Sequence, residues 1–189
     1  KIMWTVNAAL LPATLMSVYF FGLPAILVII VSILSAVIAE AGMQKLLKKD
    51  VTVSDGSAFL TGLLIAMNVP ANIPLYIPAV GSVVAIAITK HLFGGLGYNI
   101  FNPALIGRAF ILVSFAKPMT TFTQPVANIM SMDARTMATP LSVLKEDGVA
   151  KLLEMYPNIY QDLLMGNRAG SLGETATIAL LLGAAFLMI

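Results

Sequence analysis

Long apolar runs separated by short turns are the feature that most restricts the fold of this chain. Residues 2–20 and 24–47 are predominantly apolar, and each is about as long as a bilayer-spanning helix, which needs roughly 20 residues. Charged residues make up 11% of the sequence, whereas soluble domains carry about 25%. Because positions that face lipid do not tolerate charge, these features predict an all-α, polytopic transmembrane helix bundle.

The composition also excludes several other classes of protein. The net charge of +2 gives no support to a nucleic-acid partner. The sequence contains no cysteine, which rules out disulfides, Cys-ligated zinc and a Cys-bound iron–sulfur cluster within the chain. The single histidine, His91, argues against a histidine-rich metal site. The sequence therefore predicts no metal ligands and no catalytic residue.

A first transmembrane region is expected over residues 1–116. After the two long helices, the segment 54–70 is too short for a span, and we expect a broken or half-depth helix that surrounding protein buries. The segments 73–90 and 103–115 predict two further helices, separated by a glycine-rich break. Asn102 and the proline after it are typical of a helix N-cap followed by the first helical residue.

Residues 117–170 form a polar insertion between the apolar segments. This insertion predicts two short helices, at about 141–154 and 158–165. Residues 171–189 then enter the membrane again, with a helix from about residue 173, as the start of a second transmembrane half. Because the sequence does not begin with methionine and stops inside an apolar run, we expect it to be a piece of a longer protein.

Positive charge predicts the orientation of the chain. Lys45, Lys48 and Lys49 crowd the loop after the second long helix, and Lys90 flanks the glycine-rich break. Cytoplasmic loops carry an excess of lysine and arginine, so both places should face the cytoplasm. The polar insertion, residues 117–170, is then extracytoplasmic.

Two segments of the sequence resemble each other weakly. Residues 54–64, "SDGSAFLTGLL", and residues 171–181, "SLGETATIALL", share a serine, a glycine and a final pair of leucines. The first would enter the membrane from the inside and the second from the outside, which is typical of an inverted repeat. The chain would then be one half of such a fold. Chance similarity between two apolar segments explains the match equally well.

Three acids lie at or near expected helix ends. Glu40 lies about two turns inside the apolar run of the second helix, and a carboxylate in a membrane is by default a functional hypothesis. Asp55 and Glu174 are typical of helix N-termini, where the helix dipole favours negative charge. Glu40 and Asp55 are our candidates for an ion pathway. The simpler interpretations are a Glu40 bound to a neighbouring subunit and an Asp55 that only caps a helix.

Inside the polar insertion, residues 133–141 read "DARTMATPL". Taken alone, this stretch predicts an ordinary helix start, with Thr139 as N-cap and Pro140 as the first helical residue. No base or nucleophile stands beside the threonine in the sequence, so hydrolytic chemistry has no support.

Four blocks of sequence together resemble one known family. They are "SDGSAFLTGLLIAMNVP", "GGLGYNIFNPALIGRAFILVSF", "DARTMATPL" and "GSLGET". In this order they are similar to the RnfD protein of the Rnf complex and to the NqrB protein of the sodium-translocating NADH:quinone reductase, with Rnf the better match. The resemblance runs over nearly the whole chain.

The resemblance implies a covalently bound FMN. In the family, a flavin transferase attaches FMN through a phosphoester to the last threonine of the signature, which here is Thr139. Asp133, Thr136 and Ala138 match the other signature positions. We expect Arg135 to neutralise the remaining phosphate charge. The family also implies a noncovalent riboflavin between the helices, for which no residue is assigned here.

The resemblance further implies a function and a setting. The chain would be a membrane subunit of an ion-translocating ferredoxin:NAD oxidoreductase in a bacterial or archaeal plasma membrane, coupled to Na⁺ or H⁺ transport. Its partners would be a second flavin-bearing subunit, iron–sulfur subunits and the flavin transferase. The family has glycine where this sequence has Met137. One alternative is therefore a scaffold subunit that lost its flavin site through Met137. A second alternative is a redox-inactive channel or facilitator, which the short interrupted segments and the inverted repeat support.

Overall fold

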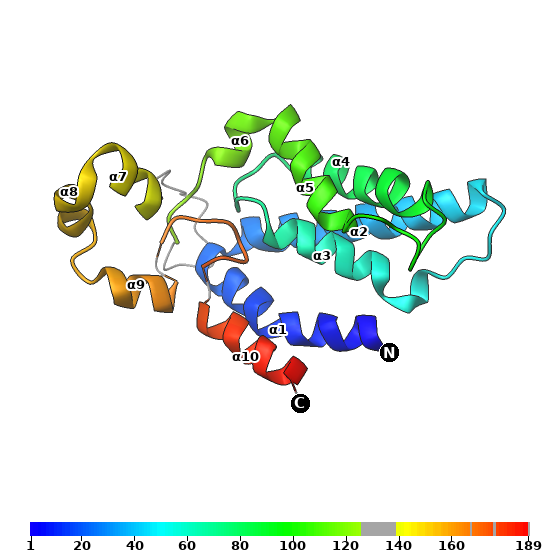
Figure 1. Cartoon of the computed structure of the whole chain (residues 1–189), viewed down its shortest axis with the longest axis horizontal. Coiled ribbons are helices and arrows are strands. Elements are labelled where there is room, and N and C mark those ends of the chain that lie inside the picture. The colour runs from blue at the N-terminus through cyan, green and yellow to red at the C-terminus, as the bar shows by residue number, and fades with distance from the viewer. Residues whose placement is uncertain (126–138, 167, 176, 189) are drawn as a thin grey trace.

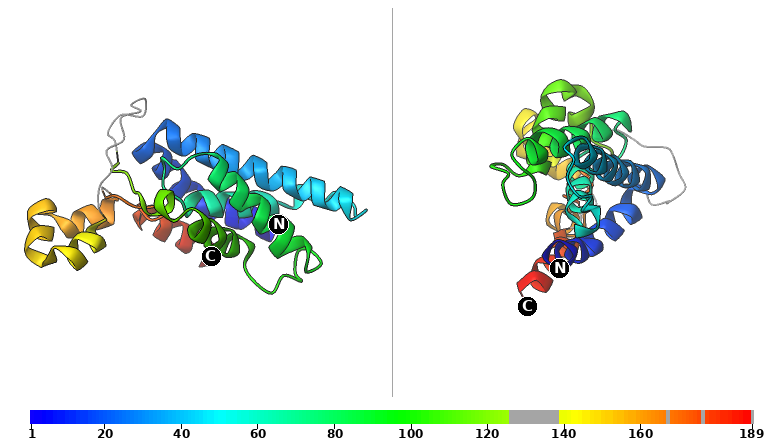
Figure 2. Two further views of the ribbon diagram at one scale, coloured as in Figure 1. Left: turned by 90° about the horizontal axis from the view of Figure 1, so that it is seen from above. Right: turned by 90° about the vertical axis from the view of Figure 1, so that its right-hand side faces the viewer.

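The structure, a computed structural model, describes residues 1–125, 139–166, 168–175 and 177–188. Within these residues the chain is helical and has no β-strand, which confirms the predicted all-α fold. Figure 1 shows a body of longer helices and, at one end, a smaller group formed by α7, α8 and α9, which we call the lobe. The left view of Figure 2 shows the lobe projecting beyond the end of the body.

The body contains six helices that the sequence predicted in whole or in part, and one short helix that it did not. The described elements of the body are α1 (Ile2–Phe21), α2 (Leu23–Leu46), the 3₁₀ turn η1 (Val53–Asp55), α3 (Ser57–Met67), α4 (Tyr76–Val84), the π-helix η2 (Ala85–His91), α5 (Pro103–Ser114), the unpredicted α6 (Ala116–Thr120) and α10 (Thr177–Met188). In the described part of the chain, α1 and α2 are the two helices that are long and apolar enough to cross a membrane.

Local sequence signals fix several of these helix ends. Pro24 lies in the first turn of α2, as predicted, and its fixed φ suits that position. The Asn102 side chain accepts a hydrogen bond from the Ala104 backbone N–H at 3.0 Å, which is the predicted N-cap of α5. These two signals need only neighbouring residues, which is why the sequence alone could place them.

Small and polar side chains make up much of the buried faces of α1 and α2, and many large apolar side chains of these helices are exposed. On α1, the buried residues Ala9, Ala13 and Ser17 recur every four positions and so form one face. Leu11 and Leu15 on the same helix are exposed over 55% and 67% of their surface. The buried face of α2 includes Ala25, Ser32, Ala36, Glu40 and Gln44. This arrangement is that of helices surrounded by lipid, where small residues let helices approach closely.

Glycines bring the backbones of two helix pairs into contact. A Cβ atom added to Gly62 of α3 would lie 2.7 Å from both the Ile33 Cα atom and the Ser32 carbonyl oxygen of α2. A Cβ atom added to Gly107 of α5 would lie 2.7 Å from the carbonyl oxygen of Gly81 on α4. The close crossing of α3 on α2 holds the start of α3 beside the C-terminal half of α2.

The predicted broken helix at 54–70 is α3, which ends at Met67. Its freed carbonyl groups are bound by the loop that precedes α10: the Gly173 N–H donates to the Met67 oxygen at 2.7 Å, and the Leu172 N–H donates to the Val69 oxygen at 3.1 Å. The Ser17 hydroxyl of α1 donates to the Leu172 oxygen at 2.6 Å. Protein groups therefore satisfy the backbone at the break, which is the condition for a helix to end inside a membrane.

The helix predicted at 73–90 differs from the structure in two respects. It begins only at Tyr76, because Pro74 disfavours the helical conformation at Ile73. From Ala85 it continues as the π-helix η2 through His91. Hydrophobic periodicity does not distinguish a π-helix from an α-helix, and π-turns are frequent at functional sites.

The lobe consists of α7 (Pro140–Glu146), α8 (Gly148–Met155) and α9 (Ile159–Met165). The sequence predicted one helix over 141–154, but the structure divides it into α7 and α8. Gly148 adopts a φ of +83°, in the left-handed region that ends a helix. The predicted helix 158–165 agrees with α9 to within one residue at its start.

A small apolar core holds the lobe together. Val143 of α7, Leu152 of α8 and Tyr156 after it are buried against one another, and Ile159 of α9 packs on them. Burial is the main cause that raises the pKa of the Tyr156 phenol, with the nearby Asp162 carboxylate as a second cause. This core joins the three helices of the lobe, while other large apolar side chains of the lobe, such as Leu141 and Leu164, are exposed.

Candidate functional site

Polar side chains are buried where α2, α3 and η2 meet. Glu40 of α2 is 1% exposed and Lys90 of η2 is 2% exposed. The Lys90 Nζ atom lies 2.6 Å from the Glu40 Oε1 atom and 2.6 Å from the Ser57 Oγ atom, and donates to both. A buried charge requires a partner of opposite charge, and this pair meets that requirement.

Further hydrogen bonds surround this ion pair. The Gln44 amide donates to the Glu40 Oε1 atom at 3.2 Å and to the Thr52 hydroxyl at 2.9 Å. The Asp55 carboxylate accepts from the Ser57 backbone N–H at 2.8 Å and from the Ser57 hydroxyl at 2.6 Å. We call Glu40, Gln44, Asp55, Ser57 and Lys90 the buried polar cluster. The two acids proposed as ion-pathway residues thus belong to one cluster. The N-cap position of α3 is Gly56 and not Asp55, although the Asp55 carboxylate binds the first N–H of this helix.

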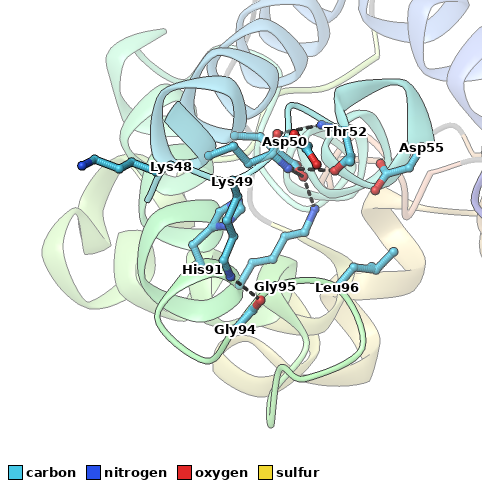
Figure 3. Close-up of a pocket in the computed structure, with 12 residues that line it drawn as sticks. Lys48, Lys49, Asp50, Thr52, Asp55, His91, Gly94, Gly95 and Leu96 are labelled. Carbon is cyan, nitrogen blue, oxygen red and sulfur yellow. Dashed lines mark hydrogen bonds and ion pairs between the residues drawn. The ribbon is translucent and has the colours of Figure 1, made fainter. Parts of the chain in front are cut away.

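A cavity of about 420 Å³ opens beside the buried polar cluster (Figure 3). Glu40, Gln44 and Lys90 line it on one side, and the loop around Lys49 lines it on another. The Lys49 ammonium donates to the Gly94 carbonyl oxygen at 2.9 Å, which joins the loop after α2 to the glycine-rich break. The cavity therefore connects the loop that the charge distribution placed at the cytoplasmic side with the buried acids.

Lys90 also lines a second cavity, of about 380 Å³, on the side of α3 and the start of α5. Ser57 and Thr61 line this second cavity together with the apolar Leu60, Leu64 and Phe101. The Lys90 side chain thus lies at the junction of a polar cavity and a more apolar one.

Some buried polar atoms near the cluster have no hydrogen-bond partner within the described residues. They are the Glu40 Oε2 atom and both ring nitrogens of His91. Buried polar atoms are normally satisfied, so each exception asks for an explanation such as a bound ion or water. Sequence reasoning missed Lys90 as a site residue, because it counted this lysine as a loop cation. The signal available was its position at the end of the apolar run predicted as a membrane-spanning helix over 73–90.

A second region of interest is the start of the lobe. Thr139 is half-buried and accepts a hydrogen bond from the Ser142 backbone N–H at 3.3 Å. Its hydroxyl also donates to the Ser142 hydroxyl at 3.2 Å. These bonds confirm the predicted N-cap of α7, with Pro140 as the next residue.

Thr139 lines a cavity of about 590 Å³ between the lobe and the loop before α10. This volume is within the range of about 300–1,000 Å³ that is usual for ligand pockets. The cavity, which we call the Thr139 cavity, is lined mainly by apolar side chains, among them Phe122, Leu141, Leu144, Leu152, Ile159 and Leu163. Arg168 is its cationic lining residue and Glu174 its acidic one.

The Arg168 guanidinium can donate further hydrogen bonds at this cavity. One terminal nitrogen of its guanidinium donates to the Glu174 carbonyl oxygen at 2.9 Å. Its Nε atom is buried and has no acceptor in the described part of the chain. The Glu174 carboxylate accepts from the Ser171 N–H at 3.3 Å, so it caps the turn before α10; the helix itself begins only at Thr177, not at residue 173 as predicted.

The structure describes one residue of the predicted flavin signature. Asp133, Arg135, Thr136 and Ala138, together with Met137, lie outside the described residues. Thr139 is the described member of the signature. Sequence reasoning missed Arg168, which lies far from the signature in the chain and is brought to Thr139 only by the fold.

Comparison with known proteins gives a consistent result over the full chain. The model of the NQR2, RnfD, RnfE family matches residues 1–189. The chain is 50% identical, over 100% of its length and 57% of the relative, to the D component of the proton-translocating ferredoxin:NAD⁺ oxidoreductase complex of Clostridium ljungdahlii. It is 45% identical to the D component of the Na⁺-translocating ferredoxin:NAD⁺ oxidoreductase complex of Acetobacterium woodii, again over 100% of the chain and 57% of the relative.

A more distant relative agrees. The D component of the ion-translocating oxidoreductase complex of Rhodobacter capsulatus is 37% identical over 100% of this chain and 59% of its own length. The chain thus spans less than two thirds of the length of each of these three proteins.

Proposed function

The chain belongs to the NQR2, RnfD, RnfE family, and we propose that it is part of the membrane component D of an ion-translocating ferredoxin:NAD⁺ oxidoreductase. The observation that carries this proposal is the 50% and 45% identity to two proteins that bear this description. One of them is named for protons and the other for Na⁺. The partners are then the other subunits of such a complex, among them a second flavin-bearing subunit and iron–sulfur subunits.

We further propose that Thr139 carries FMN through a phosphoester, attached by a flavin transferase. The Thr139 cavity supports this proposal by its size and by its lining. Its apolar residues suit the flat apolar face of a flavin ring, and Arg168 offers charge-assisted hydrogen bonds to a phosphate. Arg168 therefore joins Arg135 as a candidate for neutralising the phosphate.

Esterification of Thr139 is compatible with its structural role. Ester formation would join the Thr139 Oγ1 atom to the phosphorus of FMN, break the bond from that phosphorus to the leaving nucleotide of a flavin dinucleotide donor, and release the hydroxyl proton to water. The donated bond to the Ser142 hydroxyl would be lost, but the ester oxygen could still accept from the Ser142 N–H, which now lies at 3.3 Å. The flavin supplies the redox chemistry, while the protein holds it in place and excludes water from part of its surface.

The experiment separates the cap from the attachment. In Thr139→Asn, the side chain still caps α7 but offers no hydroxyl for a phosphoester. We expect flavin fluorescence of the denatured natural protein, absence of this signal in Thr139→Asn, and equal amounts of folded protein in both. The mass of the peptide that contains Thr139 identifies the bound group.

Two outcomes would contradict the flavin proposal. A natural protein, assembled in its own membrane, whose Thr139 peptide has the mass of the unmodified sequence would favour the scaffold alternative with Met137 in place of glycine. Flavin that survives denaturation in Thr139→Asn would place the attachment at another residue. In both cases the membership of the family would stand, because it rests on the whole chain.

A further inference from the structure

The Lys90 ammonium occupies a site made of oxygen atoms. The Glu40 Oε1 atom and the Ser57 Oγ atom each lie 2.6 Å from its Nζ atom. The Asp55 carboxylate binds the same Ser57 hydroxyl at 2.6 Å. Carboxylate and hydroxyl oxygens are also the ligands of small hard metal cations. The ammonium therefore stands where a monovalent cation would find suitable ligands.

One carboxylate oxygen of the site has no hydrogen-bond partner among the described residues, and a cavity lies on each of two sides of the site. The Glu40 Oε2 atom is buried in a residue that is 1% exposed, and among the described residues it has no hydrogen-bond partner. Glu40 lines the cavity of about 420 Å³, from which waters could complete the coordination of a cation. Lys90 lines this cavity and the second one of about 380 Å³, so its flexible side chain has room to move in either direction.

We propose that Glu40, with Ser57, forms a binding site for a monovalent cation such as Na⁺, and that the Lys90 ammonium is a tethered competitor for this site. When Lys90 moves into one of the two cavities, the cation enters; when Lys90 returns, the cation leaves. Each exchange replaces one positive charge by another, so the buried carboxylate is never left without a counter-charge. This matters because an uncompensated buried charge is strongly unfavourable.

This inference deepens the proposed ion-translocating function, on which it rests, and names the residues of one cation site. The proposal and a purely structural ion pair differ in how removal of Lys90 should affect cation binding. If Lys90 only joins η2 to α2, its removal weakens the protein and does nothing for cations. If Lys90 competes with cations, its removal improves their binding.

The test measures binding of radioactive sodium to the full-length protein in detergent, in the natural form and in Lys90→Met. Methionine has a similar length and no charge, so it vacates the site without filling it with another cation. We expect Lys90→Met to bind Na⁺ at least about tenfold more tightly, which corresponds to about 1.4 kcal/mol. The melting temperature in Na⁺ rather than choline should then rise by a few degrees in the variant and much less in the natural protein.

Three further variants define the cause. Lys90→Arg retains a tethered cation and should not gain Na⁺ binding. The double variant Lys90→Met with Glu40→Gln should lose the gain. Lys151→Met removes the lysine of the exposed pair with Asp147 and serves as the matched control, with no expected change. If Lys90→Met does not accumulate, Lys90→Gln carries the same comparison.

Folded Lys90→Met that binds Na⁺ no better than the natural protein would overturn the proposal. An equal gain in Lys151→Met or in the double variant would overturn it too, because the effect would not depend on the buried site. Flavin content of the Thr139 peptide is measured on the same samples. A bound flavin without any gain in Na⁺ binding contradicts this inference alone and leaves the proposed function standing.

Discussion

The helical body and the lobe each contain one ion pair among the residues described, and the two pairs have opposite surroundings. In the body, Lys90 and Glu40 are 2.6 Å apart, with side chains that are 3% and 1% exposed. In the lobe, Lys151 and Asp147 are 3.2 Å apart, with side chains that are 56% and 41% exposed. The ion pair of the body is buried, whereas that of the lobe is open to solvent.

This contrast shows that the two regions are built for different solvents. Helices α1 and α2, over residues 2–46, contain two charged residues, Glu40 and Lys45. The lobe with its flanking residues, 139–166, contains six, namely Lys145, Glu146, Asp147, Lys151, Glu154 and Asp162. A charge in the body therefore requires a partner or a function, while a charge in the lobe is simply hydrated.

The largest expected effect follows from breaking the buried pair. Glu40→Ala leaves the Lys90 ammonium buried without its counter-charge, and we expect a loss of about 3–5 kcal/mol in the free energy of unfolding. Asp147→Ala breaks the exposed pair of the lobe and should change stability by about 0–1 kcal/mol. Thermal unfolding in detergent compares the two variants.

A rescue variant sharpens this prediction. Glu40→Met together with Lys90→Met removes both charges of the buried pair, and should recover much of the stability that Glu40→Ala loses, because no unpaired charge remains. Equal destabilisation by Glu40→Ala and Asp147→Ala would mean that water reaches the buried polar cluster freely, and the contrast between body and lobe would not hold there.

Substitution of two glycines, one in the body and one in the lobe, should have effects of intermediate size on stability. Gly62→Ala places a Cβ atom 2.7 Å from the backbone of α2 and should cost about 1–3 kcal/mol through overpacking. Gly148→Ala meets no atom within 4 Å, but its φ of +83° should cost about 1–2 kcal/mol. Substitution by asparagine separates overpacking from backbone strain. Gly148→Asn should destabilise less than Gly148→Ala, and Gly62→Asn should destabilise more than Gly62→Ala. A different order of the four melting temperatures would contradict overpacking at Gly62 and backbone strain at Gly148 as the causes.

The smallest effect concerns the alkaline pH dependence of the lobe. The pKa of Tyr156 is raised in the folded protein, first by burial and then by Asp162. Its stabilising contribution is therefore fully present below the pKa of an unfolded tyrosine, about 10, and is lost as pH rises above that value. Tyr156→Phe should remove this loss. Thermal unfolding at increasing pH checks it, and identical alkaline slopes for both proteins would speak against a perturbed phenol.

The sequence predicted those parts of the fold whose causes are local. The long apolar runs and Pro24 placed α1 and α2 to within one residue at each end, and Asn102 placed the start of α5. The split of α7 from α8 was missed, because the predicted helix 141–154 was drawn through Gly148, whose positive φ is not visible in the sequence. The π-helix η2 was missed, because its residues do not differ in type from those of an α-helix.

The candidate sites could be predicted only in part for the same reason. The carboxylate of Glu40 was identified from its position within an apolar run, and Thr139 from a signature of adjacent residues. Their partners, Lys90 and Arg168, are separated from them by 50 and 29 positions in the chain and reach them only through the fold. Side-chain pairing across such distances leaves no local pattern in one sequence.

The π-helix has a consequence for how this segment can change in length. Its wide turn directs the neighbouring residues Lys90 and His91 both inward, where they are 2% and 5% exposed. Deleting one residue between Ala85 and Thr89 would remove the residue that the wide turn accommodates. The segment would then return to an ordinary helix without the rotation of roughly 100° that a deletion causes in a regular α-helix. A one-residue deletion should therefore be tolerated in this stretch more readily than in a regular helix such as α2.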